Sequence, residues 1–441
     1  MGYKKELQTL GDVRSNMRKK IIVVGPALSQ TGYGEQCRFA LRALMSYDDV
    51  FDIYLKAVPW GNSSWIPFKS PDRKWIDSLI QKANLHLENG GQFDVSFQVT
   101  IPNEWEKLAP INIGYTAGIE TTLVTPEWIQ KSKIVDKIIT ISEHSKEVFL
   151  KTLWEGVNES TNERVMLKCD TPIDVVHYPV RNHQSEEVDI KLDYDFNFLT
   201  MAQWGPRKNL ENTIKWWVEE FKDDEVGLVV KTNLIKTSII DRQFTQQRLQ
   251  GLLQEYKDAK CKVYLIHGNM SQGELTSLFN HPKIKCMVSL THGEGFGLPL
   301  FEAAYNGLPI IAPDWSGHRD FLYAPKKTTK KGKTTNKIKP HFAKVAYEIK
   351  KIQKQVVWKG VLHEDSSWCY PTKESYSTRL RDVYTDYNRF NNLSQALKRH
   401  IVKNFTQEKK YKEMAESVKE ICGFVSDDEI DSLFERAVEG K

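Results

Sequence analysis

The chain has 441 residues, of which 40% are hydrophobic and 27% are charged, and its formal net charge is +5. This composition is typical of a soluble globular protein, and the length favours two domains over a single core. No apolar run approaches the roughly 20 residues that span a bilayer, and the charged N-terminal stretch 1–20 lacks the apolar core of a signal peptide.

The six cysteines are scattered along the chain without any C-x-x-C pair. This spacing argues against a zinc site or a disulfide framework and favours the reducing environment of a cytoplasm. We therefore predict a cytoplasmic protein, in the host cytoplasm if the protein is viral.

The first half of the chain alternates predicted strands and helices. A buried strand at Lys20–Gly25 leads through the loop ALSQTGYGEQ into an apolar-faced helix, Cys37–Tyr47. Further strands are predicted at Phe93–Val99, Ile111–Tyr115, Lys137–Ile141 and Ile173–Tyr178, with a helix at Ser145–Leu153.

A polar stretch, Arg181–Asp195, predicts a hinge between this half and a second one of the same kind. Strands are predicted there at Phe196–Met201, Val226–Val230, Val263–His267, Ile284–Leu290 and Leu308–Ala312, and helices at Leu210–Phe221, Phe244–Lys257 and Gln272–Asn280. Beyond Tyr347 the chain is predicted to be mostly helical. The alternation predicts an α/β protein with two doubly wound parallel sheets, whose ligands bind at the carboxyl ends of the strands in the cleft between the halves.

The most informative segment is Ser289–Pro313, in which a buried strand ends at a Gly-rich loop before a short helix. The helix is predicted to begin near Pro299 and to end at Gly307. Gly295 and Gly297 allow the backbone to approach a ligand, and the backbone N–H groups with the helix dipole favour an anion. For the glycines alone, a strand–helix turn without a ligand is an equal alternative.

Two carboxylates accompany this loop. Glu294 opens it, and Glu302 is predicted in the first helical turn with its side chain directed back toward the loop. Amides suited to a diphosphate and carboxylates suited to hydroxyl groups together indicate a nucleotide sugar.

This segment resembles the donor-site signature of retaining GT-B glycosyltransferases, the large group 1 (family 4-like) family with an E-x7-E motif. The resemblance implies a GT-B fold of two Rossmann-like domains, with Glu294 beside the donor sugar and Glu302 on the ribose hydroxyls. It also places Gly295, Phe296, Gly297 and Leu298 at the donor. The stretch Asp314–Phe321 is similar to the family's loop after the next strand.

The segment Met201–Trp217 resembles the family's strand, loop and helix that carry a basic pair against the donor diphosphate. In this sequence the pair is Arg207 and Lys208, and two fixed cations at the leaving group would stabilise its developing charge. If the pair is considered without the acidic motif, the simpler interpretation is that these two residues are surface charges that precede a helix.

First-half contacts are implied by two further similarities. Gly32 and Gly34 in TGYGEQ resemble a Gly-rich loop that faces the donor, with Tyr33 beside them. Gly114–Glu120 lacks the His that many relatives have near the reacting sugar, so we assign Tyr33, Thr116 and Glu120 as acceptor-side contacts. The nucleobase is predicted beside the strand end His267–Met270, at Asn269 and Met270.

No metal is predicted. The letters Asp193-Tyr194-Asp195 spell a D-x-D motif, but they fall in the hinge and are interpreted as solvated linker. The resemblance implies no obligatory cofactor, because the basic pair and the helix dipole replace a metal, and the nucleoside-diphosphate sugar is a co-substrate.

The resemblance divides the chain into an acceptor-side domain at 1–190, a donor-binding domain at 191–405 and C-terminal helices at 406–441. One of these helices, at Glu408–Phe424 or Asp427–Val438, is predicted to cross back to the first domain. The predicted function is retaining transfer of a sugar from a nucleoside diphosphate to a hydroxyl of a saccharide or other soluble acceptor. Two alternatives remain: glycosylation of hydroxymethylated DNA bases, as in some viral GT-B enzymes, and a non-catalytic sugar- or nucleic-acid-binding relative.

A lysine block bears on the DNA alternative. Between positions 326 and 339 the chain has seven lysines and no acidic residue. The block is predicted to be a solvated, mobile loop. The second interpretation is that its lysines bind a polyanion through phosphate contacts. Its members are Lys326, Lys327, Lys330, Lys331, Lys333, Lys337 and Lys339.

Overall fold

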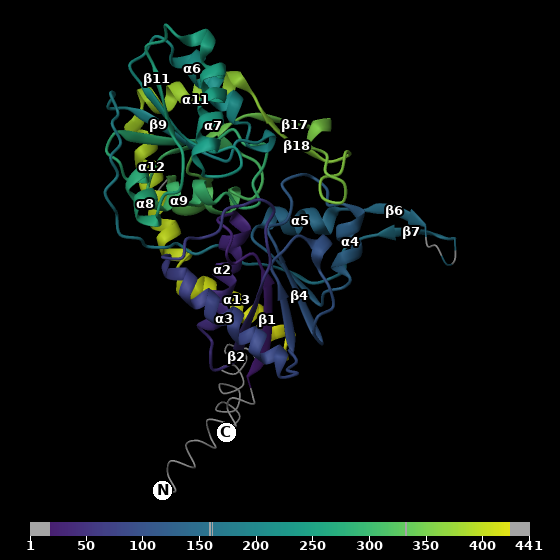
Figure 1. Cartoon of the computed structure of the whole chain (residues 1–441). Helices are drawn as coiled ribbons and strands as arrows, with labels where there is room; N and C mark the ends of the chain where they lie inside the picture. The colour runs from purple at the N-terminus through teal and green to yellow at the C-terminus, as the bar shows by residue number, and fades with distance from the viewer. Residues whose placement is uncertain (1–17, 158–159, 161, 331–332, 424–441) are drawn as a thin grey trace.

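The computed structural model describes residues 18–157, 160, 162–330 and 333–423. Each half of the chain forms a six-stranded sheet in which every neighbouring pair of strands is parallel (Figure 1). In spatial order the first sheet contains β2 (Phe51–Ala57), β1 (Lys19–Gly25), β3 (Val95–Gln98), β4 (Ile111–Thr116), β5 (Lys137–Thr140) and β8 (Ile173–Val175).

The second sheet has a similar strand order but differs at one edge, where two strands rather than one lie beyond its first strand, β9. It contains β11 (Lys262–Ile266), β10 (Gly227–Lys231), β9 (Asn197–Met201), β12 (Ile284–Val288), β13 (Ile310–Pro313) and β16 (Ala343–Val345). The prediction of two doubly wound parallel sheets is therefore confirmed. In each sheet the strand order reverses beside the first strand, β1 or β9, and such a reversal is where open α/β sheets bind ligands.

Helices cover both sheets. Those of the first half are α2 (Gly32–Met45), α3 (Pro71–Glu88), α4 (Pro126–Ser132) and α5 (Glu143–Lys151). Those of the second half are α6 (Leu210–Phe221), α7 (Ile239–Leu252), α8 (Gln272–Phe279), α9 (Leu298–Asn306), α10 (Arg319–Leu322), α11 (Lys373–Thr385), α12 (Tyr387–Asn404) and α13 (Gln407–Ile421). Short 3-10 turns are η1 (Pro102–Glu104), η2 (Pro206–Lys208), η3 (Gln254–Tyr256) and η4 (Lys354–Val356).

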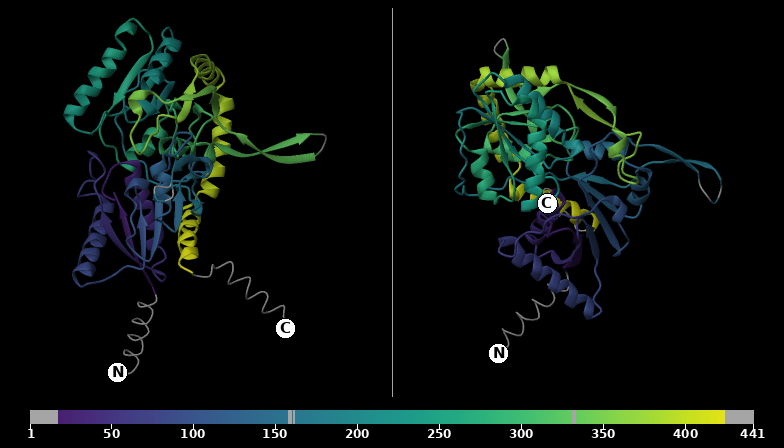
Figure 2. Two further views of the ribbon diagram at one scale, coloured as in Figure 1. Left: turned by 90° about the vertical axis from the view of Figure 1, so that its right-hand side faces the viewer. Right: turned by 45° about the horizontal axis from the view of Figure 1, so that its top comes forward.

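Three antiparallel hairpins were not predicted. They pair β6 (Trp154–Val157) with β7 (Arg164–Leu167), β14 (Tyr323–Lys330) with β15 (Lys333–Pro340), and β17 (Tyr347–Lys351) with β18 (Ser367–Pro371). Apart from Lys331, which lies outside the described residues, the lysine block belongs to a two-stranded ribbon that extends from the body of the molecule (Figure 2), and the prediction of a loop was wrong. The chain beyond Tyr347 likewise begins with a hairpin and becomes helical only from α11.

The first helix begins earlier than predicted. The Thr31 hydroxyl accepts a hydrogen bond from the Gly34 N–H, which caps α2 at Gly32 rather than at Cys37. Gly32 and Gly34 therefore lie in a helical turn and not in a loop. The strand β2 and the helix α3 that follow were missed by the sequence patterns.

The C-terminal helices connect the two sheets. Helix α12 packs against α9 of the second half, and α13 packs against α2 of the first (Figure 1). The buried Lys137 at the start of β5 donates a hydrogen bond to the Ser417 carbonyl of α13 at 3.1 Å. The alternative crossing segment, Asp427–Val438, lies outside the described residues, and the domain boundaries stay a prediction.

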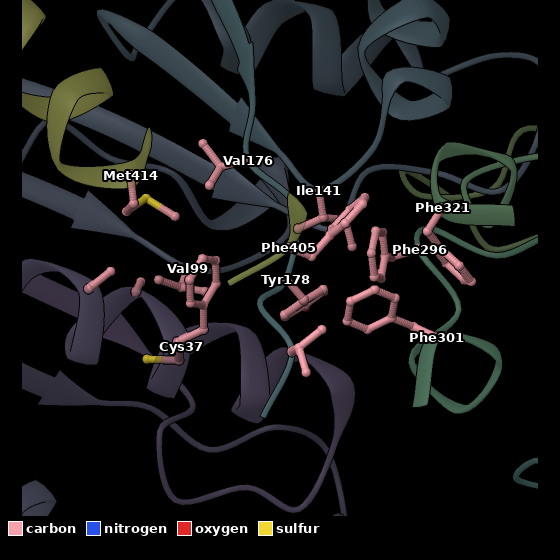
Figure 3. Packing of buried hydrophobic residues seen from close by; sticks show 14 of the residues in the cluster. Cys37, Val99, Ile141, Val176, Tyr178, Phe296, Phe301, Phe321, Phe405 and Met414 are labelled. Carbon is pink, nitrogen blue, oxygen red and sulfur yellow. The ribbon is translucent and has the colours of Figure 1, made fainter. Parts of the chain in front are cut away.

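An aromatic cluster lies where the halves meet (Figure 3). Tyr178 comes from the end of the first half, Phe405 from the turn between α12 and α13, and Phe296 from the Gly-rich loop. The Phe296 ring is 4.9 Å from that of Phe321 and 5.1 Å from that of Phe301, measured between centroids. This packing fixes the Gly-rich loop against the junction.

The two glycines at the start of α2 give a matched test of packing. An added Cβ on Gly34 would lie 2.0 Å from the Ser29 carbonyl oxygen, whereas one on Gly32 would meet nothing within 4 Å. We expect Gly34→Ala to lower the free energy of unfolding by about 2 kcal/mol or more, and Gly32→Ala to change it by less than about 0.5 kcal/mol. Equal effects of the two variants in denaturant titrations would contradict this packing.

Candidate functional site

Two loops meet at the reversal of strand order in the second sheet. One follows β9 and contains Arg207 and Lys208 in η2; the other is the Gly-rich loop that follows β12. Asn209 adopts the left-handed conformation, with φ of 51°, and its side-chain amide donates to the Leu290 carbonyl at 3.1 Å. The His292 N–H also donates to the Arg207 carbonyl at 2.8 Å, so the two loops are fixed to each other.

Glu294 is the charged centre of this site. The Lys208 ammonium donates to both Glu294 carboxylate oxygens, at 2.6 and 2.7 Å. The Arg207 guanidinium is 3.4 Å from the same carboxylate and donates to the Gly293 carbonyl at 2.7 Å. Burial alone would raise the pKa of Glu294, but Lys208 and Arg207 outweigh it and lower this pKa to about 2. The carboxylate is therefore ionised at neutral pH.

The backbone of the Gly-rich loop is packed on both sides. The Glu294 N–H donates to the Ser316 hydroxyl, and the Gly317 N–H donates to the Glu294 carbonyl. A Cβ added at Gly295 would lie 2.8 Å from the Ala117 carbonyl oxygen of the first half, so this glycine permits a close approach. Gly297, with φ of 94°, then starts α9, whose first N–H groups have no partner within the helix.

The first half contributes Glu120, whose carboxylate lies 3.2 Å from the Arg207 guanidinium. The other two predicted acceptor-side residues bond to each other, because the Tyr33 and Thr116 hydroxyls are 2.9 Å apart. The Tyr33 ring also stacks on Trp60, with centroids 4.2 Å apart. The sequence analysis did not identify Trp60.

Residues 185–329 match the family model described as glycosyl transferases group 1, and this segment contains Arg207, Lys208, Glu294 and Glu302. The chain is a glycosyltransferase. No curated protein sequence matches it significantly.

Solved structures show the fold of this glycosyltransferase. It is similar to a glycosyltransferase from Rickettsia africae ESF-5 (TM-score 0.56, 12% identity) and to sucrose-phosphate synthase from Thermosynechococcus elongatus (TM-score 0.57, 12% identity). It is also similar to the E. coli structure described as trehalose-6-phosphate bound with UDP-2-fluoro glucose (TM-score 0.50, 10% identity). Each comparison covers 92% of this chain and 99% of the other. The predicted GT-B fold is confirmed.

Glu302 lies just beyond the helical turn in which it was predicted. Because α9 begins at Leu298, its first turn has no acidic residue. A cavity of about 10 Å³, large enough for roughly one water molecule, is lined by Glu302, Arg181 and Glu35. Burial raises the pKa of Glu302 to about 7, and Arg181 opposes this shift.

Glu35 and Arg181 were missed as site residues. Their side chains form an ion pair at 2.7 Å and line the same small cavity as Glu302. Glu35 belongs to TGYGEQ, in which only the glycines and Tyr33 were singled out. Arg181 opens the polar stretch that was interpreted as a hinge, so local sequence gave no signal for this contact.

The predicted nucleobase residues lie at the end of β11, two strands away from β9. Asn269 is exposed and Met270 is half-buried. Between these positions and Glu302 lies Lys231, whose ammonium donates to the Gly268 carbonyl at 3.2 Å. Burial lowers the pKa of Lys231, and Glu302 acts in the opposite direction.

No group of three His, Cys, Asp or Glu side chains in the described part of the chain is arranged to hold a metal ion. In the D-x-D sequence, Asp193 forms an ion pair with Lys262 at 3.0 Å, and Asp195 forms one with Lys283 at 3.1 Å. Within the described residues, no helix is both long and apolar enough to cross a bilayer.

If Glu302 binds the donor ribose, as predicted, its pKa makes donor affinity depend on pH. Below about pH 7 the carboxyl is protonated and would accept hydrogen bonds from ribose hydroxyls less well than the carboxylate does. We expect the affinity for UDP, measured by calorimetry, to rise by up to about 10-fold from pH 6 to pH 8. Glu302→Gln should bind UDP more weakly at pH 8 and lose this rise. Ionisation of UDP itself affects both proteins equally, so parallel pH profiles would reject the role.

Proposed function

We propose that this glycosyltransferase transfers a sugar, with retention of configuration, from a nucleoside diphosphate to an acceptor hydroxyl. The observation that carries the proposal is the convergence of Arg207, Lys208 and Glu294 at the carboxyl ends of β9 and β12. The E. coli structure bound with UDP-2-fluoro glucose supports a nucleotide-sugar donor.

Each of the three side chains has a role in this proposal. Arg207 and Lys208 take the negative charge that develops on the leaving diphosphate. Glu294 orients the sugar by accepting hydrogen bonds from its hydroxyls, because a carboxylate with a pKa of about 2 is a poor base at neutral pH. Glu302 accepts hydrogen bonds from the ribose.

Retention follows if the leaving group departs and the acceptor attacks on the same face of the sugar. Glu294 is paired with two cations, which disfavours it as a nucleophile. The leaving phosphate oxygen then takes the proton of the acceptor hydroxyl as the new glycosidic bond forms. The anomeric configuration of the product, read by NMR, tests this assignment.

Replacement of Lys208 tests the catalytic proposal. Lys208→Ala should lower the turnover of a nucleotide sugar, with or without acceptor, by about 100-fold or more, as expected for loss of one preorganised charge. The exposed Lys222→Ala removes the same charge outside the site and should leave turnover unchanged. A panel of UDP-, ADP- and GDP-sugars supplies the donor. Turnover that survives Lys208→Ala would remove the catalytic assignment, and no turnover by the wild type would favour the non-catalytic alternative.

A saccharide acceptor is favoured by a cavity of about 360 Å³ between the halves. Its walls come from α5 and from the segment after β13. The lining includes the Trp315 ring and three carboxylates, those of Glu143, Glu147 and Asp320. An aromatic face with surrounding carboxylates suits the apolar face and the hydroxyls of a sugar. Ser316, which binds the Glu294 N–H, also lines the cavity and connects it to the donor loop.

DNA is the second candidate acceptor, and the projecting ribbon β14–β15 favours it. Exposed Lys326 lies opposite exposed Lys337, and Lys339 follows on the same ribbon. A two-stranded ribbon fits the major groove, and its lysines would contact phosphates while a hydroxymethylated base is turned out toward the cleft.

Substitution of these three lysines tests the DNA proposal. In Lys326→Ala/Lys337→Ala/Lys339→Ala, the slope of log affinity for duplex DNA against log salt should fall by about 0.9 for each lost phosphate contact. Exposed Lys69, Lys74 and Lys133, replaced together, remove the same charge elsewhere and should not change the slope. Equal slopes for both triple variants, or no binding by the wild type at low salt, would exclude this role of the ribbon.

A further inference from the structure

Both cations assigned to the diphosphate are already paired with carboxylates. Lys208 lies between the two Glu294 oxygens. Arg207 contacts Glu294 at 3.4 Å and Glu120 at 3.2 Å. A donor diphosphate must therefore compete with one of the carboxylates for Arg207, and the structure indicates which anion leaves. Lys208 has three N–H groups, two of which bind Glu294, so one is available to the diphosphate.

Glu294 is fixed in place. Its side chain is 10% exposed, its backbone N–H donates to Ser316 and its carbonyl accepts from the Gly317 N–H. Removing it from Lys208 and Arg207 would leave a buried charge without a partner, which is strongly unfavourable.

Glu120 is the replaceable partner. It belongs to the loop after β4 on the opposite half, its side chain is 21% exposed, and its ion pair with Arg207 joins the two halves. Solvent partly compensates a partly exposed carboxylate that leaves its partner, so this exchange costs less than removal of the more buried Glu294. The Glu120 carbonyl oxygen would lie 2.5 Å from a Cβ on Gly293, so its loop directly contacts the donor loop.

We propose that Glu120 is an internal anion that occupies the diphosphate position on Arg207 and is displaced when the donor enters. The proposal rests on the proposed diphosphate role of Arg207. A diphosphate replaces Glu120 because it contacts Arg207 and Lys208 together, whereas a single phosphate competes with Glu120 for one cation. Glu120 therefore determines specificity, because it weakens the binding of small anions more than that of diphosphates.

Inorganic pyrophosphate tests this inference without a choice of base or sugar. Calorimetry compares the wild type, Glu120→Gln and a control, Asp77→Asn, which removes a half-buried carboxylate of α3 that pairs with Arg73 at 2.9 Å, outside the described site. We expect Glu120→Gln to bind pyrophosphate about 5-fold more tightly and inorganic phosphate more tightly by a larger factor. Asp77→Asn should bind both anions as the wild type does.

A second pair of variants tests whether Glu120 acts through Arg207. In an Arg207→Gln background, Glu120→Gln should no longer tighten pyrophosphate binding, because the cation that it frees is absent. Pyrophosphate affinity in Glu120→Gln that equals or falls below the wild-type value would overturn the inference, as would a gain that persists without Arg207. Thermal melts confirm that each variant is folded.

The outcomes also separate this inference from the proposed function. Tighter pyrophosphate binding by Glu120→Gln with unimpaired turnover in Lys208→Ala rejects the catalytic assignment and keeps the inference. Loss of turnover in Lys208→Ala with no gain in Glu120→Gln rejects the inference alone. Binding of pyrophosphate by none of the proteins rejects both.

Discussion

The buried Glu294 carboxylate and its two cations are the constraint on which the rest of the cleft depends. A carboxylate in this position would be protonated if burial acted alone, and only the adjacent Lys208 and Arg207 keep it charged. Both cations come from the loop after β9, so the site requires β9 and β12 to be neighbours in the sheet. The left-handed Asn209 and its bond to Leu290 then fix the loops at the required distance.

Apolar and polar contacts connect the halves at different places. The aromatic cluster around Phe296 joins the Gly-rich loop to the segments that pass between the sheets (Figure 3). On the cleft side, Arg207 pairs with Glu120, and His177 and the Glu143 N–H both bind Asp320. The apolar contacts do not depend on charge, whereas the polar contacts are ion pairs and charge-assisted hydrogen bonds. The two kinds of contact therefore respond differently to salt and pH.

Local sequence predicted the parts of the molecule that local chemistry determines. Helix α6 has the predicted bounds, and Gly307 ends α9 with φ of 86°, because periodicity and a left-handed cap are short-range properties. The basic pair and Glu294 were also predicted to share a site, and they are in contact. The helix α9 begins at Leu298, one residue before the predicted start at Pro299. Proline is common at the first helical position, so Leu298 was assigned to the loop.

Other features depend on contacts that adjacent residues do not encode. The ion pair of Glu35 with Arg181 joins positions that are far apart in the sequence, and neither belongs to a pattern by itself. In the lysine block, the charge pattern concealed the repeated threonines, which favour strands. Glu120 was identified as a contact of the first half, but its partner Arg207 became evident only when the two sheets were placed together.

The position of α13 affects how the protein is made. Met414, Ala415 and Val418 are fully buried, and α13 covers α2, one of the first helices to leave the ribosome. The apolar surface of α2 is therefore covered only after α13, a helix near the other end of the described chain, has been synthesised. Until α13 has been synthesised, the first half lacks this covering helix, and transiently exposed apolar surface of this kind is what chaperones bind.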